Sequence, residues 1–285
     1  MYNQIMTRLE EIFKTTRPLI GMVHLAPLLG VNNAPSIKDN IKNALEDART
    51  IEAAKFDAIM IENNYDLPHD IFVKPNVVAS FTYIAHKIRE AVSLPIGICV
   101  LWNDFYTALS IAKLIDADFV RVPVFVDHVE TSYGIVKGTP EEVINFRSKI
   151  GGDNIAVFTD IQVKHSKLLN VRPISESALE AKQKGSDGLI VTGKWTGDAP
   201  KTQDLEEVRG AIEDFPIIVG SGASTDNIAT LLKFADGIIV GTAIKHGETV
   251  SKEENVNLKS FGQRISLDKA RDFKEKFMGV LAENR

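Results

Sequence analysis

Two small-residue turns near the C-terminal end of this chain have the composition of a phosphate-binding site. The apolar residues 217–219 lead into Gly-Ser-Gly at 220–222, and the apolar residues 238–240 lead into Gly-Thr at 241–242. Turns of this kind leave backbone N–H groups unpaired, and such groups hold a phosphate without a lysine or an arginine. The alternative is that the glycines only permit tight turns from strand to helix. We predict that a phosphate binds the amides of Ser221, Gly222, Gly241 and Thr242.

Charged residues fall at the carboxyl ends of several predicted strands. In one strand the β-branched Ile59 and Ile61 suit a layer of surrounding helices, which turns Glu62 inward. The same alternation turns inward Arg121, Asp160 and Thr192. Buried charges are costly unless they are paired, so Glu62, Arg121 and Asp160 could form a structural ion cluster. Active sites use the same residue types, and in that case Glu62 and Asp160 are the candidate general bases.

Two histidines and a lysine complete the candidate catalytic set. His24 ends the first predicted strand, and either it or His165 is the candidate acid/base partner, although a lone histidine is also a common structural residue. Lys164 could form a Schiff base if desolvated, but its polar neighbours indicate an exposed loop lysine, so we assign it an electrostatic role. A divalent metal on Glu62, Asp160 and a histidine stays open, although the chain lacks a compact ligand motif, and no other cofactor is predicted.

Two polar segments after strands supply candidate substrate contacts. The segment 61–68 contains Asn63, and the Gly/Thr-rich segment 192–200 could contact hydroxyl groups or a second anion. The aromatic residues Tyr65 and Trp195 would stack on a base if the substrate were a nucleoside, or else pack within a lid. We therefore add to the predicted substrate-binding residues Asn63, Arg121, Thr192 and Gly193.

A repeating alternation of strands and helices must position these residues. The predicted strands are 19–25, 58–63, 96–103, 119–124, 155–161, 188–193, 217–222 and 237–242. The predicted helices are 37–54, 76–92, 105–115, 140–150, 175–184, 205–213, 227–233 and 267–281. This alternation favours a parallel α/β sheet, and eight repeats favour a (β/α)8 TIM barrel with its chemistry at the carboxyl ends of the strands. A doubly wound open sheet is the alternative, but no GxGxxG motif follows the first strand.

Three segments lie outside this repeat. Residues 1–17 are amphipathic, with apolar residues at helical spacing, and predict a helix that caps the bottom of the barrel: Ile5, Leu9, Ile12 and Phe13. Residues 127–139 contain Tyr133-Gly134 and predict a hairpin or a lid. Residues 246–266 are polar and are expected to wrap the outside. With no convincing linker, residues 1–285 are predicted to form a single domain.

Composition excludes several classes of partner. The 285 residues carry a net charge of −5, which gives no basic field for nucleic acid or for an anionic membrane surface. No apolar run is long enough for membrane insertion, and no secretory signal opens the chain. The single cysteine, Cys99, cannot form a disulfide within the chain, so a cytoplasmic location is expected. We also expect a homo-oligomer, because barrels commonly assemble in this way.

The polar segments, in order, resemble those of the BtpA/SgcQ family. The family pattern Gly-x-x-His-Leu-x-Pro-Leu-x-Gly matches 21–30, Glu-Asn-x-x-Asp-x-Pro matches 62–68, and Asp-x-x-x-Lys-His matches 160–165. The pattern Thr-Gly-x-x-Thr-Gly-x-Ala-Pro matches 192–200, and both glycine turns match as well. Two departures occur: the first segment lacks the second proline that the family usually has before its last glycine, and the tail after Lys245 lacks a Trp/Pro-containing segment.

This resemblance implies a (β/α)8 barrel of the ribulose-phosphate-binding type with a phosphate site. One branch of the family is linked to photosystem I biogenesis and another to sugar phosphotransferase systems, and the residues select neither. We expect an enzyme that acts on a small phosphorylated metabolite, a sugar phosphate, by isomerase, epimerase or aldolase-type (lyase) acid/base chemistry. The alternatives are a non-catalytic phosphometabolite sensor or complex-assembly factor, and a metal-assisted hydrolase of a phosphorylated or nucleoside substrate.

Overall fold

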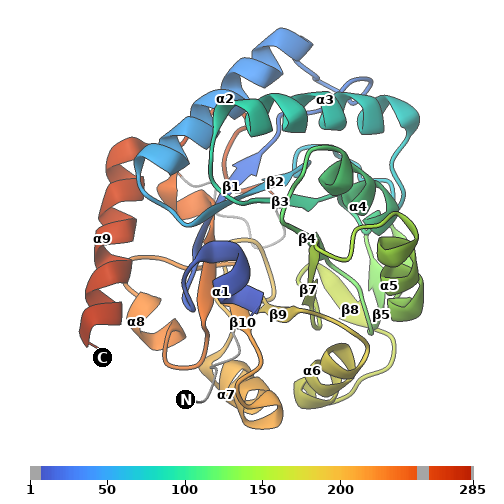
Figure 1. Cartoon of the computed structure of the whole chain (residues 1–285), viewed down its shortest axis with the longest axis vertical. Coiled ribbons are helices and arrows are strands. Elements are labelled where there is room, and N and C mark those ends of the chain that lie inside the picture. The colour runs from blue at the N-terminus through green and yellow to red at the C-terminus, as the bar shows by residue number, and fades with distance from the viewer. Residues whose placement is uncertain (1–7, 249–256, 284–285) are drawn as a thin grey trace.

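The central element is a closed barrel of eight parallel strands. The computed structural model describes residues 8–248 and 257–283. In barrel order the strands are β1 (Leu19–His24), β2 (Ala58–Glu62), β3 (Ile96–Cys99), β4 (Phe119–Val122), β7 (Ala156–Asp160), β9 (Gly188–Val191), β10 (Ile217–Val219) and β11 (Gly237–Val240). Strand β11 pairs with β1 and closes the barrel (Figure 1). The (β/α)8 prediction is confirmed, with every predicted strand present and shortened at its carboxyl end.

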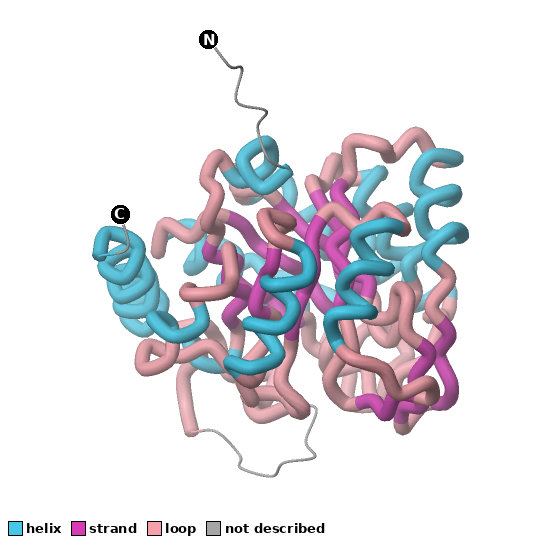
Figure 2. Tube along the Cα trace, turned by 90° about the horizontal axis from the view of Figure 1, so that it is seen from below, coloured by secondary structure: helices cyan, strands magenta, loops and turns pink. Residues whose placement is uncertain are grey.

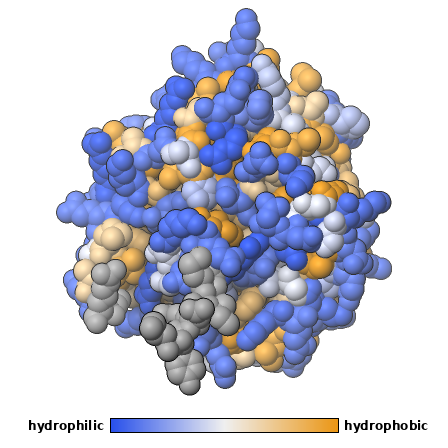
Figure 3. Space-filling view, viewed as in Figure 1, coloured by the Kyte–Doolittle hydropathy of each residue, from blue (hydrophilic) through white to orange (hydrophobic). Residues whose placement is uncertain are grey.

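Helices surround the barrel. They are α2 (Ile37–Ala53), α3 (Pro75–Ala91), α4 (Phe105–Leu114), α5 (Pro140–Lys149), α6 (Ile174–Gln183), α7 (Thr202–Ile212), α8 (Ile228–Leu231) and α9 (Leu267–Glu283), with a short 3₁₀ turn, η1 (Thr242–Ile244). Local sequence sets their starts, as where the Ser36 hydroxyl accepts the Asp39 amide at the start of α2. Hydrophilic residues predominate on the face in Figure 3. In the described part of the chain, no helix has the length and apolar content needed to cross a bilayer.

The side-chain alternation predicted for β2 is confirmed. Ala58 and Met60 are buried in the barrel interior, in the same cluster as Phe119 and Phe158. Ile59 and Ile61 belong instead to the larger cluster between the strands and the helices. This alternation directs Glu62 into the barrel at the carboxyl end of β2, so the strand itself positions the carboxylate.

A short N-terminal helix, α1 (Arg8–Phe13), closes one end of the barrel. Its Leu9 and Phe13 are buried in the barrel interior, where the Phe13 ring meets Phe119 edge-on at 5.4 Å and stacks on Phe158 at 6.1 Å. The predicted capping helix is therefore confirmed for these residues, whereas Ile5 lies outside the described residues. Figure 1 looks onto this end, with α1 near the centre of the strands.

A small antiparallel sheet lies at the opposite end of the barrel. It consists of β5 (His128–Thr131), β6 (Gly134–Lys137) and β8 (Ser166–Leu168), in the order β6-β5-β8. Figure 2 shows this sheet beside the loops at the end of the molecule away from α1. The hairpin predicted in 127–139 is present, but β8 was not predicted, because three residues carry no recognisable period.

Residues 257–261 of the connection after β11 fold over the barrel mouth, so the prediction that the connection wraps the outside is wrong for them. It holds for Arg264 and Ile265, which bind Asp47 of the outer helix α2 at 3.0 and 2.8 Å. The Asn64 side chain donates to Asn257 at 2.5 Å, and the Tyr65 hydroxyl donates to the Lys259 carbonyl at 2.6 Å. Polar composition suggested an exterior path. The side chains instead find their hydrogen-bond partners in the loop after β2, which composition alone does not reveal.

Candidate functional site

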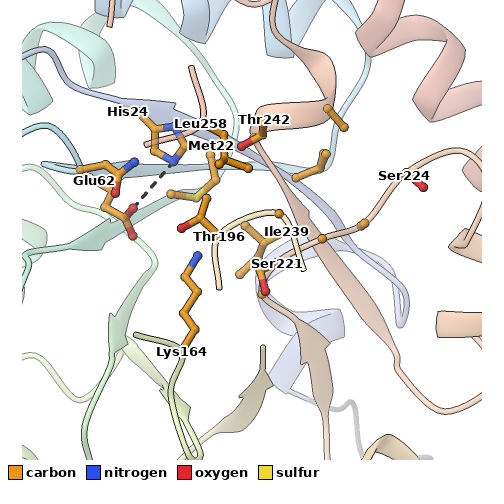
Figure 4. A pocket seen from close by; sticks show the side chains of 18 of the residues that line it. Met22, His24, Glu62, Lys164, Thr196, Ser221, Ser224, Ile239, Thr242 and Leu258 are labelled. Carbon is orange, nitrogen blue, oxygen red and sulfur yellow. Dashed lines mark ion pairs between the residues drawn. The ribbon is translucent and has the colours of Figure 1, made fainter. Parts of the chain in front are cut away.

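A cavity of about 220 Å³ opens at the carboxyl ends of the strands, the end opposite α1. We call it the main cavity. Its ionisable and polar lining includes His24, Glu62, Asn64, Arg121, Lys164 and Thr196. The rest of its wall comes mainly from the loops after β10 and β11, residues 220–224 and 241–243. Figure 4 shows both groups of residues facing the same space. The structure therefore brings the predicted phosphate turns and most of the predicted ionisable residues together.

The two glycine turns line the main cavity with backbone. In the described part of the chain, no hydrogen bond joins the amide N–H of Gly222, Ala223 or Thr242 to a protein acceptor. Neighbouring amides are used internally: Gly220 donates to the Val191 carbonyl at 2.9 Å and Ser224 donates to Asn227 at 2.9 Å. Ala223 is buried and Gly222 and Thr242 are half-buried, so these amides face the main cavity without a protein acceptor, and a cluster of such amides suits an anion.

Glycine is required in both turns by close approach of other backbone or side chains. Gly222 has φ +68°, and a β-carbon there would lie 2.0 Å from the Ala199 backbone nitrogen. A β-carbon on Gly241 would lie 2.9 Å from the His24 ring. The tight-turn explanation is therefore correct for Gly222 and is compatible with anion binding, because both uses need exposed backbone.

Arg121 is the centre of a buried ion cluster. Its guanidinium donates to both oxygens of Asp160, at 2.7 and 2.8 Å, and lies 3.7 Å from the Glu62 carboxylate. Burial works against the charge of Arg121, but the attraction of Asp160 outweighs burial and raises the pKa of the guanidinium. Asp160 is fully enclosed and does not line the main cavity, whereas Glu62 does. The two carboxylates are therefore not equivalent.

His24 lies against Glu62, with 3.7 Å between its Nε2 and a carboxylate oxygen (Figure 4). Burial, and then the positive charges of Lys245, Lys164 and Arg121, hold the pKa of His24 well below its usual range. The imidazole is therefore neutral at neutral pH, and the contact with Glu62 is not a salt bridge. A neutral imidazole can donate one hydrogen bond and accept one.

Lys164 is partly buried and lines the main cavity, so the prediction of an exposed loop lysine is wrong. Burial, and then the charge of Arg121, lower the pKa of its amine. The cause of its burial is the path of the loop, because the Lys164 amide donates to the Thr192 hydroxyl at 3.0 Å and fixes the loop beside the next strand. Figure 4 shows the Lys164 amine on the same side of the cavity as Thr196 and Glu62.

A smaller cavity of about 40 Å³, the second cavity, adjoins the main cavity. The two share part of their walls: Glu62, Asn64, Arg121, Lys164 and Thr196. Of the two cavities, the predicted catalytic residue His165 lines only the second. Its Nε2 accepts the Thr196 amide N–H at 3.1 Å, which places the ring proton on Nδ1. Burial, and then the charge of Lys164, lower the pKa of His165 to about 4.

Three predicted substrate contacts hold loops together and line neither cavity. The Asn63 side chain bonds both backbone groups of Leu101, the Thr192 hydroxyl accepts the Lys164 amide, and the Gly193 amide donates to the Ser221 hydroxyl. Tyr65 packs edge-on against Phe261, as expected for a lid aromatic. These residues fix the loops whose other side chains line the cavities.

The sequence did not point to several residues that the structure brings to the mouth. Asn64 and Thr196 belong to predicted polar segments without an assigned role, and both line the two cavities. Leu258 comes from the loop after β11 and covers the main cavity. Lys245 is fully buried beside Tyr65, with 3.5 Å between its amine and the phenol oxygen, and burial lowers its pKa to about 8.

The set of residues proposed for a divalent metal does not converge. Both oxygens of Asp160 are held by Arg121, and His24 lies beside Glu62 alone. Among residues 8–248 and 257–283, no three histidine, cysteine, aspartate or glutamate side chains come together as a metal-ligand group.

A closed (β/α)8 barrel with a polar cavity at the carboxyl ends of its strands defines the class of this protein. A sequence profile of the BtpA family matches residues 15–261, and the chain belongs to that family. It is 40% identical over 261 residues to an uncharacterized protein of Thermococcus kodakarensis, covering 91% of this chain and 94% of that protein. It is 33% identical over 255 residues to the photosystem I biogenesis protein BtpA of Synechocystis, covering 88% of each.

Solved structures of similar shape include two enzymes with phosphorylated compounds in their names. The (S)-3-O-geranylgeranylglyceryl phosphate synthase of Thermoplasma acidophilum, in complex with sn-glycerol-1-phosphate, has a TM-score of 0.57 and 15% identity, covering 96% of this chain and 99% of that one. The N-(5'-phosphoribosyl)anthranilate isomerase of Pyrococcus furiosus has a TM-score of 0.55 and 12% identity, covering 92% and 99%. At these identities the similarity shows the fold alone.

Proposed function

We propose that this protein is an enzyme that moves a proton on a small sugar phosphate, in isomerase, epimerase or aldolase-type chemistry. One observation carries the proposal: a single cavity of about 220 Å³ is lined on one side by unpaired backbone amides and on the other by Glu62, His24 and Lys164. The structurally similar barrels named for phosphorylated compounds support a ligand of this class.

The phosphate would bind the turns that contain Ser221, Gly222, Gly241 and Thr242. Backbone amides bind an anion in a fixed direction, and their positions change little because the barrel strands hold both turns. Phosphate binding in these turns supplies binding energy away from the reacting carbon, and this energy orients the carbon skeleton toward the ionisable wall.

Glu62 would be the general base. Its carboxylate lines the main cavity, lies 3.7 Å from the Arg121 guanidinium and has the buried Cys99 thiol as a hydrogen-bond partner. Its remaining lone pairs would accept the proton of a substrate C–H. Asp160 would act as a positioning residue, because its bidentate bond to Arg121 fixes the guanidinium below Glu62. Proton removal next to a carbonyl puts negative charge on oxygen, and the Lys164 amine would stabilise that charge. The neutral His24 would donate a hydrogen bond to the same oxygen or exchange a proton with it.

The test is exchange of carbon-bound protons in D₂O, followed by NMR for a panel of ketose and aldose phosphates of three to six carbons. We expect deuterium uptake next to the carbonyl of at least one member, and a decrease of about 100- to 10,000-fold in Glu62→Gln. Glu62→Gln has the same size and keeps hydrogen bonding, so a loss of exchange with unchanged thermal stability isolates the proton transfer.

A second pair of variants tests the phosphate turns separately. Ala243 is exposed and lines the main cavity, so Ala243→Asp adds a negative charge there with little steric cost, unlike a substitution at Gly222. We expect inorganic phosphate to bind at least about tenfold more weakly to Ala243→Asp and nearly normally to the neutral Ala243→Asn. Phosphate binding without proton exchange for any sugar phosphate would favour a phosphometabolite sensor over an enzyme.

A further inference from the structure

One buried histidine has no partner for either of its ring nitrogens. His69 is 5% exposed, and in the described part of the chain neither Nδ1 nor Nε2 makes a hydrogen bond. Its ring instead meets the edge of Tyr133 at 5.2 Å. Buried polar atoms in native proteins nearly always have a hydrogen-bond partner. The two unpaired nitrogens of His69 therefore indicate a partner that does not belong to the chain.

His69 is one of the residues that line the second cavity. The remaining wall of this cavity is apolar and aromatic, from Leu101, Trp102, Pro123 and Val163. The loop that carries His69 is fixed there by backbone, because the Trp102 amide donates to the Asp70 carbonyl at 2.9 Å. His69 is therefore held at a defined place, and its unused nitrogens are not a product of a loose loop.

A second imidazole stands in the same wall. His165 uses Nε2 as an acceptor for the Thr196 amide, which leaves its Nδ1 proton as the donor. Burial lowers the pKa of His69 to about 4, as it does for His165, so both rings are uncharged at neutral pH. Two neutral imidazoles between apolar walls suit uncharged polar groups such as hydroxyls, each of which can donate and accept.

We propose that the second cavity binds the end of the substrate opposite its phosphate, and that His69 recognises a terminal hydroxyl group there. A volume of about 40 Å³ accommodates about three hydroxyl-sized groups, which corresponds to one or two hydroxylated carbons. Because the two cavities share the wall that contains Glu62 and Lys164, one molecule would span both with its reacting carbon between them. This inference rests on the proposed function and narrows its substrate to an open-chain sugar phosphate whose far end is an uncharged polyol.

The discriminating experiment compares probes that fill one or both cavities. Inorganic phosphate reaches only the turns of the main cavity, dihydroxyacetone phosphate extends toward Glu62, and ribulose 5-phosphate is long enough to reach His69. The variant His69→Phe keeps the aromatic ring against Tyr133 and removes both nitrogens, and His69→Gln restores a donor and an acceptor. Binding of each probe to each variant is measured by calorimetry.

We expect His69→Phe to weaken ribulose 5-phosphate about tenfold while inorganic phosphate binds within twofold of the unmodified protein. His69→Gln should recover part of the loss. An equal loss for both probes, or no loss for ribulose 5-phosphate, would overturn the subsite. Failure of the proposed function looks different: inorganic phosphate would not bind or would be insensitive to Ala243→Asp, or no sugar phosphate of the panel would exchange a carbon-bound proton.

The thermal stability of the free protein gives a second, independent measurement. If the role of His69 is ligand recognition, removing its unpaired nitrogens should leave the unfolding temperature unchanged or raise it. A merely structural histidine would lose stability in His69→Phe and would weaken both probes equally. In the unmodified protein, the imidazole nitrogen NMR signals of His69 should shift with ribulose 5-phosphate and stay in place with inorganic phosphate.

Discussion

The two ends of the barrel differ in the residues that occupy the inward-facing positions of the same strands. At the end that α1 closes, Phe13, Phe119 and Phe158 fill the barrel interior with aromatic contacts. At the other end, Arg121 and Glu62 occupy inward positions of the same kind with charges. The closed end is built for stability, and the open end keeps charged and unpaired groups whose burial is costly.

This difference indicates which end of the barrel binds a ligand. Unpaired amides in the glycine turns, an unpaired His69 and a lysine with a lowered pKa all lie at the open end. Such features lower stability and persist where a ligand completes them. Variants at each end should therefore separate stability from ligand binding, and three substitutions test this separation in order of expected effect.

The largest effect is expected for Arg121→Met at the open end. Removing the guanidinium leaves Asp160 fully enclosed without its bidentate partner, so the free energy of unfolding should fall by about 4–5 kcal/mol. Urea unfolding measures this change. The double variant Arg121→Met/Asp160→Leu removes both members of the pair and should recover a large part of the loss. A double variant as unstable as the single one would show that the ion pair is not the cause.

The next effect is expected for Phe13→Ala at the closed end. Loss of a ring that contacts Phe119 and Phe158 creates a cavity under the short helix α1, and the free energy of unfolding should fall by about 3 kcal/mol. Affinity for inorganic phosphate, measured by calorimetry, should not change, because the substitution lies at the other end of the barrel. Weaker phosphate binding in Phe13→Ala would contradict the separation of the two ends.

The smallest effect has the opposite sign and concerns Lys245. Its amine is fully buried with a pKa of about 8 in the folded protein against an ordinary value of 10.5, so Lys245→Met should raise the free energy of unfolding by about 1–3 kcal/mol at pH 7. Between pH 8 and 10.5 the unfolded chain retains a proton that the folded protein has lost, so raising the pH stabilises the fold of the unmodified protein.

The gain from Lys245→Met should therefore be greatest below pH 8 and shrink toward pH 10.5. Comparing urea unfolding of the two proteins across this range cancels the titration of all other groups. A pH-independent difference would mean that the lost charge of Lys245 is not responsible. The removed charge also lies near His24, whose pKa should rise in the variant.

The sequence by itself determined the architecture and the facing of its strands. Period-two alternation in β2 was enough to place Glu62 inside and Ile61 outside, because alternation is a property of the strand alone. The two glycine turns were likewise readable, since a turn after an apolar run is local. The action on a sugar phosphate is a prediction that rests on these residues, Glu62 and the two glycine turns.

The tertiary structure alone decided which side chains meet. Glu62 and Asp160 are both carboxylates at the carboxyl ends of strands. Arg121 binds both oxygens of Asp160, however, and leaves Glu62 facing the main cavity. The burial of Lys164 and the convergence of His69 with His165 were also settled there. These outcomes depend on the paths of loops that belong to different strands. The apolar periodicity of a strand or helix does not indicate how such loops pack against one another, because their contacts form only when the barrel closes.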